Sequence, residues 1–353
     1  MSIYPGRGAR ALRTAPLLLL GALAACDGSS TGSEEPAENS VTVDASASWA
    51  YVRLDAARNP VTVASPSRSG DWDIAFNATS VMLNGGSVGM AGVAAFCLCQ
   101  NSSATDAQVM AMTAAGEALD FETVTAARIP AAADAWVADT LKPAVTGWYA
   151  YDTGARTVAP DPSRTWKVRT AEGTGYAKVR VTAIAGATQT APGTVTLEYA
   201  LQPAAGAAFG ETRTLQVPVP NATAPVYVDL ARGAVTDAAD WDLAFDGWNL
   251  RVNGGASGSG QAGAALATSA FASITTASDL AATAYRGDAA GGLFGVKRWY
   301  RYNLTGTDHQ VWPTYEVYLL KRGSTVWKVQ VTGYYSAAGN PRHISLRWAK
   351  LAG

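Results

Sequence analysis

The sequence predicts an all-β fold, arranged as two tandem copies of one antiparallel β domain behind a signal peptide and a flexible tether. Tyr176–Ile184 and Thr325–Tyr335 alternate apolar and polar residues and are rich in β-branched side chains, which is typical of strands with one buried face. The 35 glycines and 16 prolines interrupt the chain at short intervals, as turns between many short strands require. Helical periodicity of useful length is missing from the sequence.

The first 25 residues have the layout of a signal peptide. Arg7, Arg10 and Arg13 precede an apolar run that is shorter than the roughly 20 residues of a membrane-spanning helix. The run ends in Leu23-Ala24-Ala25-Cys26, which resembles the bacterial lipobox, where cleavage before the cysteine is coupled to its acylation. We therefore expect a lipoprotein precursor that is cut before Cys26 and lipidated on that residue.

A polar segment follows the lipidation site. Residues 26–40 are mostly Ser, Gly and Glu after the cysteine, a composition typical of a solvated tether. Removal of the signal peptide takes away three arginines and no acid, so the net charge falls from −1 to −4. This charge argues against a nucleic-acid partner and against a polybasic membrane patch. The lipid is then the only membrane attachment that the sequence predicts.

Four motifs recur in the same order in the two halves of the chain, which predicts a duplicated domain. The pairs are Trp72–Phe76 with Trp241–Phe245, Asn84–Gly86 with Asn253–Gly255, Trp148–Tyr151 with Trp299–Tyr302, and Lys178–Thr182 with Lys328–Thr332. We expect Trp-Asp-φ-Ala-Phe to be a strand whose apolar residues face the core while its aspartate points outward or caps a turn. The Asn-Gly-Gly triplets predict tight turns.

The repeats set the expected domain boundaries at 41–205 and 206–353, with Gln202–Gly206 as the joint. The spacing between matched motifs falls from 169 residues to 151, so the first copy carries about 18 additional residues between its Asn-Gly-Gly and its Trp-Tyr motifs. Each copy is long enough to build a core of its own.

Together the repeated motifs resemble the HmuY family of haem-binding envelope lipoproteins, over nearly all of the chain after the tether. The resemblance implies an all-β, hand-like domain that holds haem between two projecting hairpins through two axial side chains, commonly histidines. It also implies a role in iron acquisition, in which haem is handed to an outer-membrane receptor. An outer-membrane location follows from the resemblance, although Asp27 after the lipidated cysteine favours inner-membrane retention in enteric bacteria.

The only two histidines of the chain, His309 and His343, are the candidate haem ligands. If residues 315–321, 326–335 and 344–350 form three consecutive antiparallel strands, both histidines fall at the same end of one sheet. Two strand spacings place their backbones roughly 10 Å apart, which is compatible with two imidazoles on one iron. Asp308 is a candidate partner for a ring nitrogen of His309, and Arg342 for a haem propionate.

The first copy has Arg156 and Thr194 at about the positions of the two histidines, so it cannot ligate haem through imidazole. It contains all methionines after the initiator, which are core filler or thioether ligands: Met82, Met90, Met110 and Met112. It also contains Cys97 and Cys99, whose Cα atoms on one strand would lie roughly 6.6 Å apart, near the limit for a disulfide. A strained disulfide and a soft-metal site both remain open.

A catalytic function is not indicated. The sequence contains no metal-binding helix motif and no Cys-x-x-Cys pair of the kind that enzymes use, and it has only two histidines that could serve as a catalytic base. The alternative to haem binding is an envelope recognition or structural module that lost the cofactor and binds a protein or carbohydrate. The 11 tryptophans and 14 tyrosines suit flat ligands of either kind.

Replacing the lipidated cysteine tests the anchoring prediction. Cys26→Ser removes the thiol that carries the lipid, so the variant should stay unprocessed or leave the membrane fraction. The readout is metabolic labelling with a fatty acid, together with fractionation of the cells. Acylation and membrane fractionation at the level of the unmodified chain would contradict the prediction.

Overall fold

The computed structural model describes residues 38–351, which are mostly β-strand in several antiparallel sheets. The predicted all-β fold is therefore confirmed. The expected signal peptide, Cys26 and residues 26–37 of the expected tether lie outside the described residues. Asn39 and Ser40, which we expected to end the tether, instead belong to strand β1 (Asn39–Asp44). No helix within residues 38–351 is long and apolar enough to cross a membrane.

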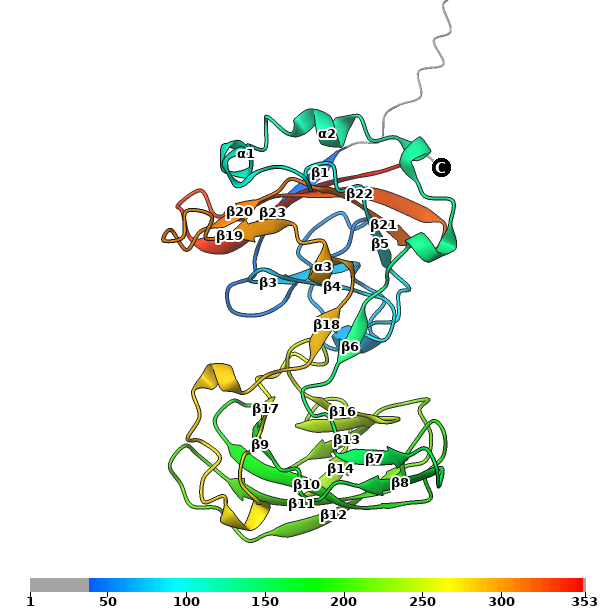
Figure 1. The fold of residues 1–353 in the computed structure, drawn as a ribbon, viewed down its shortest axis with the longest axis vertical. Coiled ribbons are helices and arrows are strands. Elements are labelled where there is room, and N and C mark those ends of the chain that lie inside the picture. The colour runs from blue at the N-terminus through cyan, green and yellow to red at the C-terminus, as the bar shows by residue number, and fades with distance from the viewer. Residues whose placement is uncertain (1–37, 352–353) are drawn as a thin grey trace, which may run out of the picture. The chain divides into compact units, whose positions relative to one another are not determined.

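The two largest hydrophobic cores of the described residues lie in different parts of the chain. We name these parts the outer lobe (39–142 and 289–351) and the inserted lobe (143–288). Two five-stranded sheets dominate the two lobes (Figure 1). Short 3-10 helices lie in the connections, at Pro66–Arg68, Ala126–Arg128, Ala133–Ala135, Phe271–Ser273 and Ala282–Ala284.

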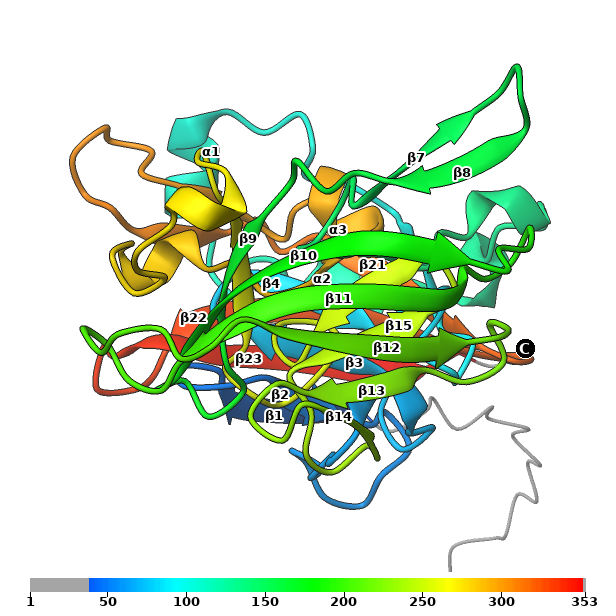
Figure 2. The ribbon, with the colours of Figure 1, turned by 90° about the horizontal axis from the view of Figure 1, so that it is seen from below.

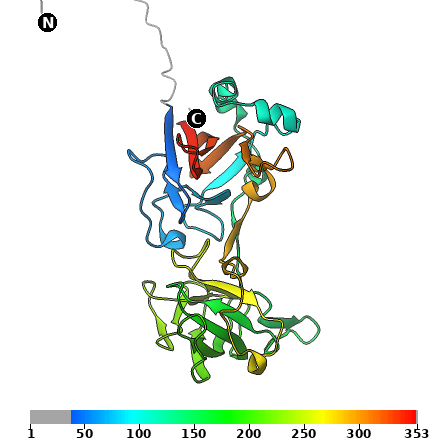
Figure 3. The same ribbon diagram turned by 90° about the vertical axis from the view of Figure 1, so that its left-hand side faces the viewer.

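The main sheet of the outer lobe has the order β1-β23-β22-β21-β5, so the first and last strands of the described chain are neighbours. Figure 3 shows the blue first strand beside the red end of the chain. The remaining strands of this sheet are β23 (Pro341–Lys350), β22 (Thr325–Tyr335), β21 (Val317–Arg322) and β5 (Ala94–Cys97). The expected meander of three antiparallel strands is confirmed as β21, β22 and β23.

Both faces of this sheet are covered. A three-stranded sheet contributes to the core against one face, with strands β2 (Ala50–Val52), β3 (Ile74–Asn77) and β4 (Ser80–Leu83). On the other face, Phe121 of α2 (Ala118–Glu122) packs against Val317 and Leu319, while Tyr318 and Leu320 belong to the first core. This double burial explains why β21 reads as a continuous apolar run.

Three short elements complete the outer lobe. They are helix α1 (Asp106–Ala111), helix α3 (Leu293–Val296) and the hairpin of β19 (Tyr300–Tyr302) with β20 (Val311–Pro313). Helix α1 begins with a capping box in which Thr105 and Gln108 bond each other's backbone, which satisfies amides that a helix start leaves free. Helices α1 and α2 lie in the stretch that carries the additional residues of the first copy.

The inserted lobe packs a five-stranded sheet against a four-stranded one. Figure 2 shows β10, β11 and β12 side by side. The larger sheet has the order β12 (Arg213–Val219), β11 (Gly193–Gln202), β10 (Tyr176–Ala185), β9 (Trp166–Arg169) and β17 (Gly263–Leu266). The smaller has the order β14 (Ala234–Thr236), β13 (Val226–Asp229), β15 (Leu243–Asp246) and β16 (Asn249–Val252). A separate hairpin pairs β7 (Tyr149–Asp152) with β8 (Thr157–Pro160).

Two short antiparallel strands connect the lobes: β6 (Thr140–Lys142), where the chain leaves the outer lobe, and β18 (Ala289–Gly291), where it returns. The inserted lobe thus interrupts the outer lobe, and each lobe combines one half of the first sequence copy with one half of the second. Trp72–Phe76 of the first copy shares the outer core with Lys328–Thr332 of the second. Trp241–Phe245 of the second copy shares the inserted core with Lys178–Thr182 of the first.

The boundary that we expected at residues 205 and 206 does not separate the two cores. It falls between β11 and β12, which pair with each other in one sheet. Strands β9 and β17 also pair across it. The reason is that half of each sequence copy packs against half of the other copy. The division between the two lobes therefore lies at β6 and β18.

The aspartates of the two Trp-Asp motifs are buried rather than outward, and each accepts the amide of a turn residue, which agrees with the other expected role, that of capping a turn. Asp73 accepts a hydrogen bond from the Leu54 amide at 2.8 Å and forms an ion pair with Arg322 at 2.7 Å. Asp242 accepts from the amides of Leu230 and Ala171, at 2.9 and 2.8 Å. Burial raises the pKa of both carboxyls, and the backbone bonds compensate for much of the cost of burying the charge.

The Asn-Gly-Gly triplets form loops that pack against the connections between the lobes. Gly86 and Gly255 have φ angles of +63° and +64°, and a Cβ on either would lie 1.9 or 2.0 Å from the carbonyl oxygen of Asp139 or Asp288. Only glycine fits this approach. The asparagines fix the loops: Asn84 donates to Trp72 O at 2.8 Å, and Asn253 donates to Trp241 O at 2.8 Å.

Asp139 and Asp288 directly precede β6 and β18, and their side chains are buried beneath these loops. Asp139 accepts from the Leu83 amide at 2.8 Å. Asp288 accepts hydrogen bonds from the amides of Val252 at 3.1 Å and Ala144 at 2.8 Å. It therefore links the segment just before β18 to the segment just after β6. Burial raises the pKa of each carboxyl to about 6.

The nested arrangement predicts which fragment folds alone. Residues 143–288 contain the whole inserted core and should unfold in one cooperative thermal transition, whereas residues 206–353 lack partner strands for both cores and should not. Circular dichroism of the two purified fragments measures this. A cooperative transition for 206–353 together with a disordered 143–288 would contradict the exchange of halves.

The raised pKa of Asp139 predicts a pH-dependent effect of Asp139→Asn. Because the folded state takes up the proton more readily than the unfolded chain, this carboxyl stabilises the fold most below about pH 4, and the contribution is lost as the pH rises through about 6. From pH 4 to 7, the unfolding free energy of the variant should therefore rise relative to the unmodified chain by on the order of 2 kcal/mol. Denaturant titrations measure it, with the exposed Asp134→Asn as the control. A difference between Asp139→Asn and the unmodified chain that does not change with pH would show that Asp139 does not titrate as described.

Candidate functional site

Aromatic side chains gather in the outer lobe, where the β19–β20 hairpin meets the ends of β22 and β23. Ring centroids lie 5.0 Å apart for Trp299 and Tyr300, 6.1 Å for Trp299 and Tyr334, and 5.0 Å for Tyr334 and Tyr335. The Tyr335 hydroxyl accepts from the amide of Val311 at 3.1 Å, which ties the hairpin to β22. We call this region the aromatic end, defined by Trp299, Tyr300, Tyr302, Tyr334 and Tyr335.

The aromatic end is buried at its base and open at its rim. Trp299 is 1% exposed, whereas Tyr335 is 37% and Tyr302 is 54% exposed. Exposed tyrosine rings offer an apolar face together with a polar hydroxyl. The rim can therefore contact a flat ligand that is partly apolar.

His309 lies in the loop between β19 and β20, beside the exposed Tyr302. Its Nδ1 is 3.1 Å from the Tyr302 hydroxyl, and its backbone amide donates to Asn303 Oδ1 at 3.0 Å. The Nε2 atom makes no hydrogen bond to any residue in the described part of the chain and is exposed with the ring. One ring nitrogen of His309 is therefore paired with Tyr302, and the other is open to solvent.

Asp308 does not orient the His309 ring, contrary to the suggestion from the sequence. Its carboxylate accepts from the Trp312 indole at 3.1 Å and from the Gln310 amide at 3.1 Å. Because Gln310 and Trp312 already engage this carboxylate, Tyr302 takes the place that we expected Asp308 to fill.

His343 lies near the start of β23, opposite Asp44 in the β1–β23 ladder. Its Nδ1 is 3.0 Å from Pro341 O and its Nε2 is 4.0 Å from Asp44 Oδ2. His343 is thus on the main sheet, whereas His309 is on the separate β19–β20 hairpin, which the Val311–Tyr335 hydrogen bond ties to the end of β22. No contact among residues 38–351 joins their rings, so a shared ligand would have to bridge them.

Arg342 is the exposed residue next to His343, and its backbone has a φ of +67°. Its guanidinium donates to Ser46 O at 3.4 Å and lies close enough to Tyr334 to act on the pKa of that hydroxyl. The cation is therefore attached to the aromatic end, in a position to meet an anionic group there.

The matching place in the inserted lobe has aromatic rings but no imidazole. Trp248 stacks on Trp148 at 5.9 Å and contacts Tyr149 at 4.6 Å. Arg156, with a φ of +56°, precedes β8 as His309 precedes β20, while Thr194 lies in β11 opposite Pro218. The two lobes therefore share an aromatic framework and differ in ligand chemistry.

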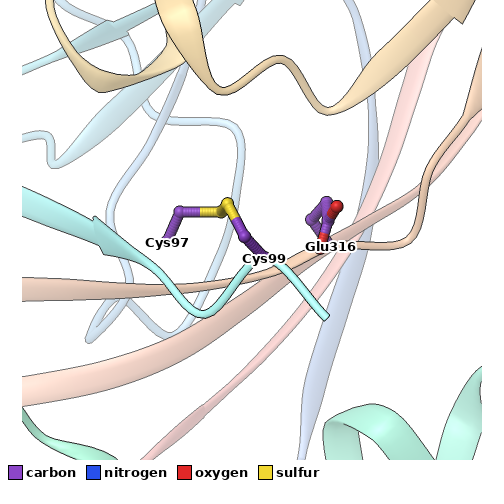
Figure 4. Close-up of side chains that lie close together, drawn as sticks. All are labelled: Cys97, Cys99 and Glu316. Carbon is purple, nitrogen blue, oxygen red and sulfur yellow. A yellow bond between two sulfur atoms is a disulfide. The ribbon is translucent and has the colours of Figure 1, made fainter. Parts of the chain in front are cut away.

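Cys97 and Cys99 form a disulfide, shown with the neighbouring Glu316 in Figure 4. Strand β5 ends at Cys97, and Cys99 adopts a φ of +51°, which brings the two Cα atoms to 5.1 Å instead of the spacing of an extended strand. Glu316 lies within 4.8 Å and accepts from the Asn101 amide at 3.0 Å. Because the sulfurs are bonded to each other, neither is a thiolate that could hold a soft metal.

The methionines of the first copy do not share one environment. Met82 is fully buried with Tyr51 and Trp72, as expected of core filler. Met90 is 65% exposed, on the loop after the first Asn-Gly-Gly. These two thioethers therefore do not form a common ligand set.

The comparisons with known proteins decide the family. The family model described as HmuY protein matches residues 45–199 and 221–310, which is well over half of the chain. The chain belongs to the HmuY family. His309 lies within the matched residues of this HmuY chain, whereas His343 lies beyond them.

Solved structures offer a weaker likeness to this HmuY-family chain. A crystal structure of a candidate lipoprotein from Bacteroides fragilis is 12% identical, covers 88% of each chain, and superposes with a TM-score of 0.32. No curated protein matches the chain significantly.

Sequence reasoning about this HmuY-family chain missed the buried pair of Asp139 and Asp288. The only signal was their position, 149 residues apart, close to the spacing of the later motifs. It also missed Tyr302 as the partner of His309, although Tyr302 is the last residue of the Trp-Tyr-x-Tyr motif. The roles of these aspartates and of Tyr302 depend on contacts between distant parts of the chain, so the residue types alone do not predict them.

Proposed function

We propose that this HmuY-family protein is a haem-binding lipoprotein of the bacterial cell envelope that binds haem at the aromatic end of the outer lobe. The observation that supports the proposal is that His309 contacts Tyr302 of the aromatic end, while Arg342 and His343 lie at the start of β23, the strand that follows Tyr334 and Tyr335. Membership of a family associated with haem supports the choice of ligand.

The donor set fits haem in chemical type. Imidazole nitrogens are common axial ligands of haem iron, and the Nε2 atom of His309 has no partner within the described residues. Haem supplies the iron centre that these nitrogens coordinate. His309 is the primary ligand in this account, because its loop places an exposed ring at the tip of a hairpin.

His343 is proposed as the second ligand. Its Nε2 lies 4.0 Å from Asp44 Oδ2. Binding iron would break only this long contact with an exposed carboxylate, which contributes little to stability. Arg342 provides a cation next to it for a propionate, and the rings of Tyr302 and Tyr335 provide apolar surface for a porphyrin face.

Anchoring through Cys26 would keep this site outside the cytoplasm. A lipid-tethered haem carrier, favoured at the outer membrane, fits a role in iron acquisition in which haem passes to an outer-membrane receptor. The inserted lobe has no imidazole, so under this proposal it binds no haem through histidine.

Titration of the full mature chain with hemin tests the proposal. The unmodified chain should sharpen the Soret band at one equivalent and give a six-coordinate low-spin spectrum. The variant with both His309→Ala and His343→Ala should lose that spectrum and bind at least tenfold more weakly, and His309→Ala alone should leave a five-coordinate species.

Arg156→Ala is the matched control, since it changes the corresponding hairpin of the inserted lobe. It should leave the spectrum unchanged. If the double histidine variant keeps the spectrum and affinity of the unmodified chain, the proposed ligands are wrong.

A further inference from the structure

A cleft lies where segments of the two lobes face each other, and one of its lining residues, Asp44, also faces His343. It consists of two adjoining cavities of about 500 and 310 Å³, a size suited to small ligands. Both cavities are lined by Trp49, Asn77, Gly255, Gly260 and Gln261, so they form one continuous cleft.

The glycine-rich wall of the cleft is held firmly. Ala256 is 1% exposed and belongs to a hydrophobic cluster with Tyr51 and Trp72 of the outer lobe. The Gly260 amide donates to Asn253 Oδ1 at 3.1 Å, which closes the loop. The cleft is therefore a preformed feature with packed walls.

Several polar groups along the cleft have no internal partner. The Trp49 indole N–H and the side-chain amides of Asn77 and Gln261 make no hydrogen bond to any residue between 38 and 351. Trp49 and Asn77 are half-buried, so leaving these groups unpaired costs free energy unless water or a ligand satisfies them.

The charged groups of the cleft have hydrogen-bond partners within the protein. Both Asp288 oxygens accept backbone amides, Arg169 donates to Gln261 O at 2.8 Å, and Asp44 accepts from the Ser46 amide at 2.9 Å. The unpaired groups that both cavities share are neutral, namely the Trp49 indole and the carboxamides of Asn77 and Gln261, and the exposed hydroxyls of Ser48 and Ser259 lie in the first cavity. Carboxamides both donate and accept, as the hydroxyls of a sugar do.

From this lining we infer that the cleft binds a neutral carbohydrate, with the Trp49 ring as its apolar platform. An anionic ligand would find a single cation among the lining residues, Arg169, together with the acidic side chains of Asp44 and Asp288, and haem would find no histidine there. The site shares no residue with the proposed haem ligands, so either can fail without the other.

Binding of the mature chain to an array of neutral and acidic oligosaccharides tests the inference. The neutral probes are linear hexaoses of glucose, xylose, mannose, galactose and N-acetylglucosamine, and calorimetry follows up each hit. At least one neutral oligosaccharide should bind. Trp49→Ala should weaken binding at least tenfold and Asn77→Ala several-fold.

Trp136→Ala, a half-buried tryptophan outside the cleft, is the matched control and should bind as the unmodified chain does, as should the double histidine variant. Asn77→Ala keeps the test valid if Trp49→Ala fails to fold. The inference is overturned if no neutral oligosaccharide binds, if only acidic sugars or peptides bind, or if neither cleft variant weakens binding.

Discussion

The packing of each Asn-Gly-Gly loop against a buried aspartate is the constraint on which the nested fold depends. Gly86 lies against the backbone of Asp139 and Gly255 against that of Asp288, so close that no other residue fits. The aspartates accept the amides of Leu83 and Val252 at the ends of the neighbouring hairpins. Two loops thereby fix the points where the chain leaves the outer lobe and returns to it.

The sequence predicted the strands and the repeat but not the exchange of halves. The Trp-Asp and Lys-Val motifs are nearly the same in both copies. The Trp-Asp strand of one copy could therefore pack against the Lys-Val strand of the same copy or against that of the other copy. What distinguishes the two arrangements is long-range pairing, such as that of Asp73 with Arg322, which no local pattern encodes. The domain boundary was misplaced for this reason.

For the candidate site, too, the strands could be predicted from the sequence but the side-chain contacts could not. Counting strands predicted the meander itself, in which the first and third strands run in the same direction, but not that His309 lies on a separate hairpin of β19 and β20. The hydrogen-bond partners of the side chains were not predictable: the Trp312 indole donates to Asp308, and the Tyr302 hydroxyl hydrogen-bonds His309. Likewise, the left-handed backbone at Cys99 brings two cysteines together that an extended strand would hold apart.

The two lobes of this HmuY-family chain therefore have one framework and different chemistry, with imidazoles in the outer lobe alone. The central claim is that these imidazoles hold haem iron. Electron paramagnetic resonance of the mature chain, labelled with ¹⁵N-histidine and loaded with ferric haem, tests it directly, because the chain has only two histidines. The account predicts a low-spin signal with hyperfine coupling to histidine nitrogens, and a high-spin signal without that coupling would contradict it.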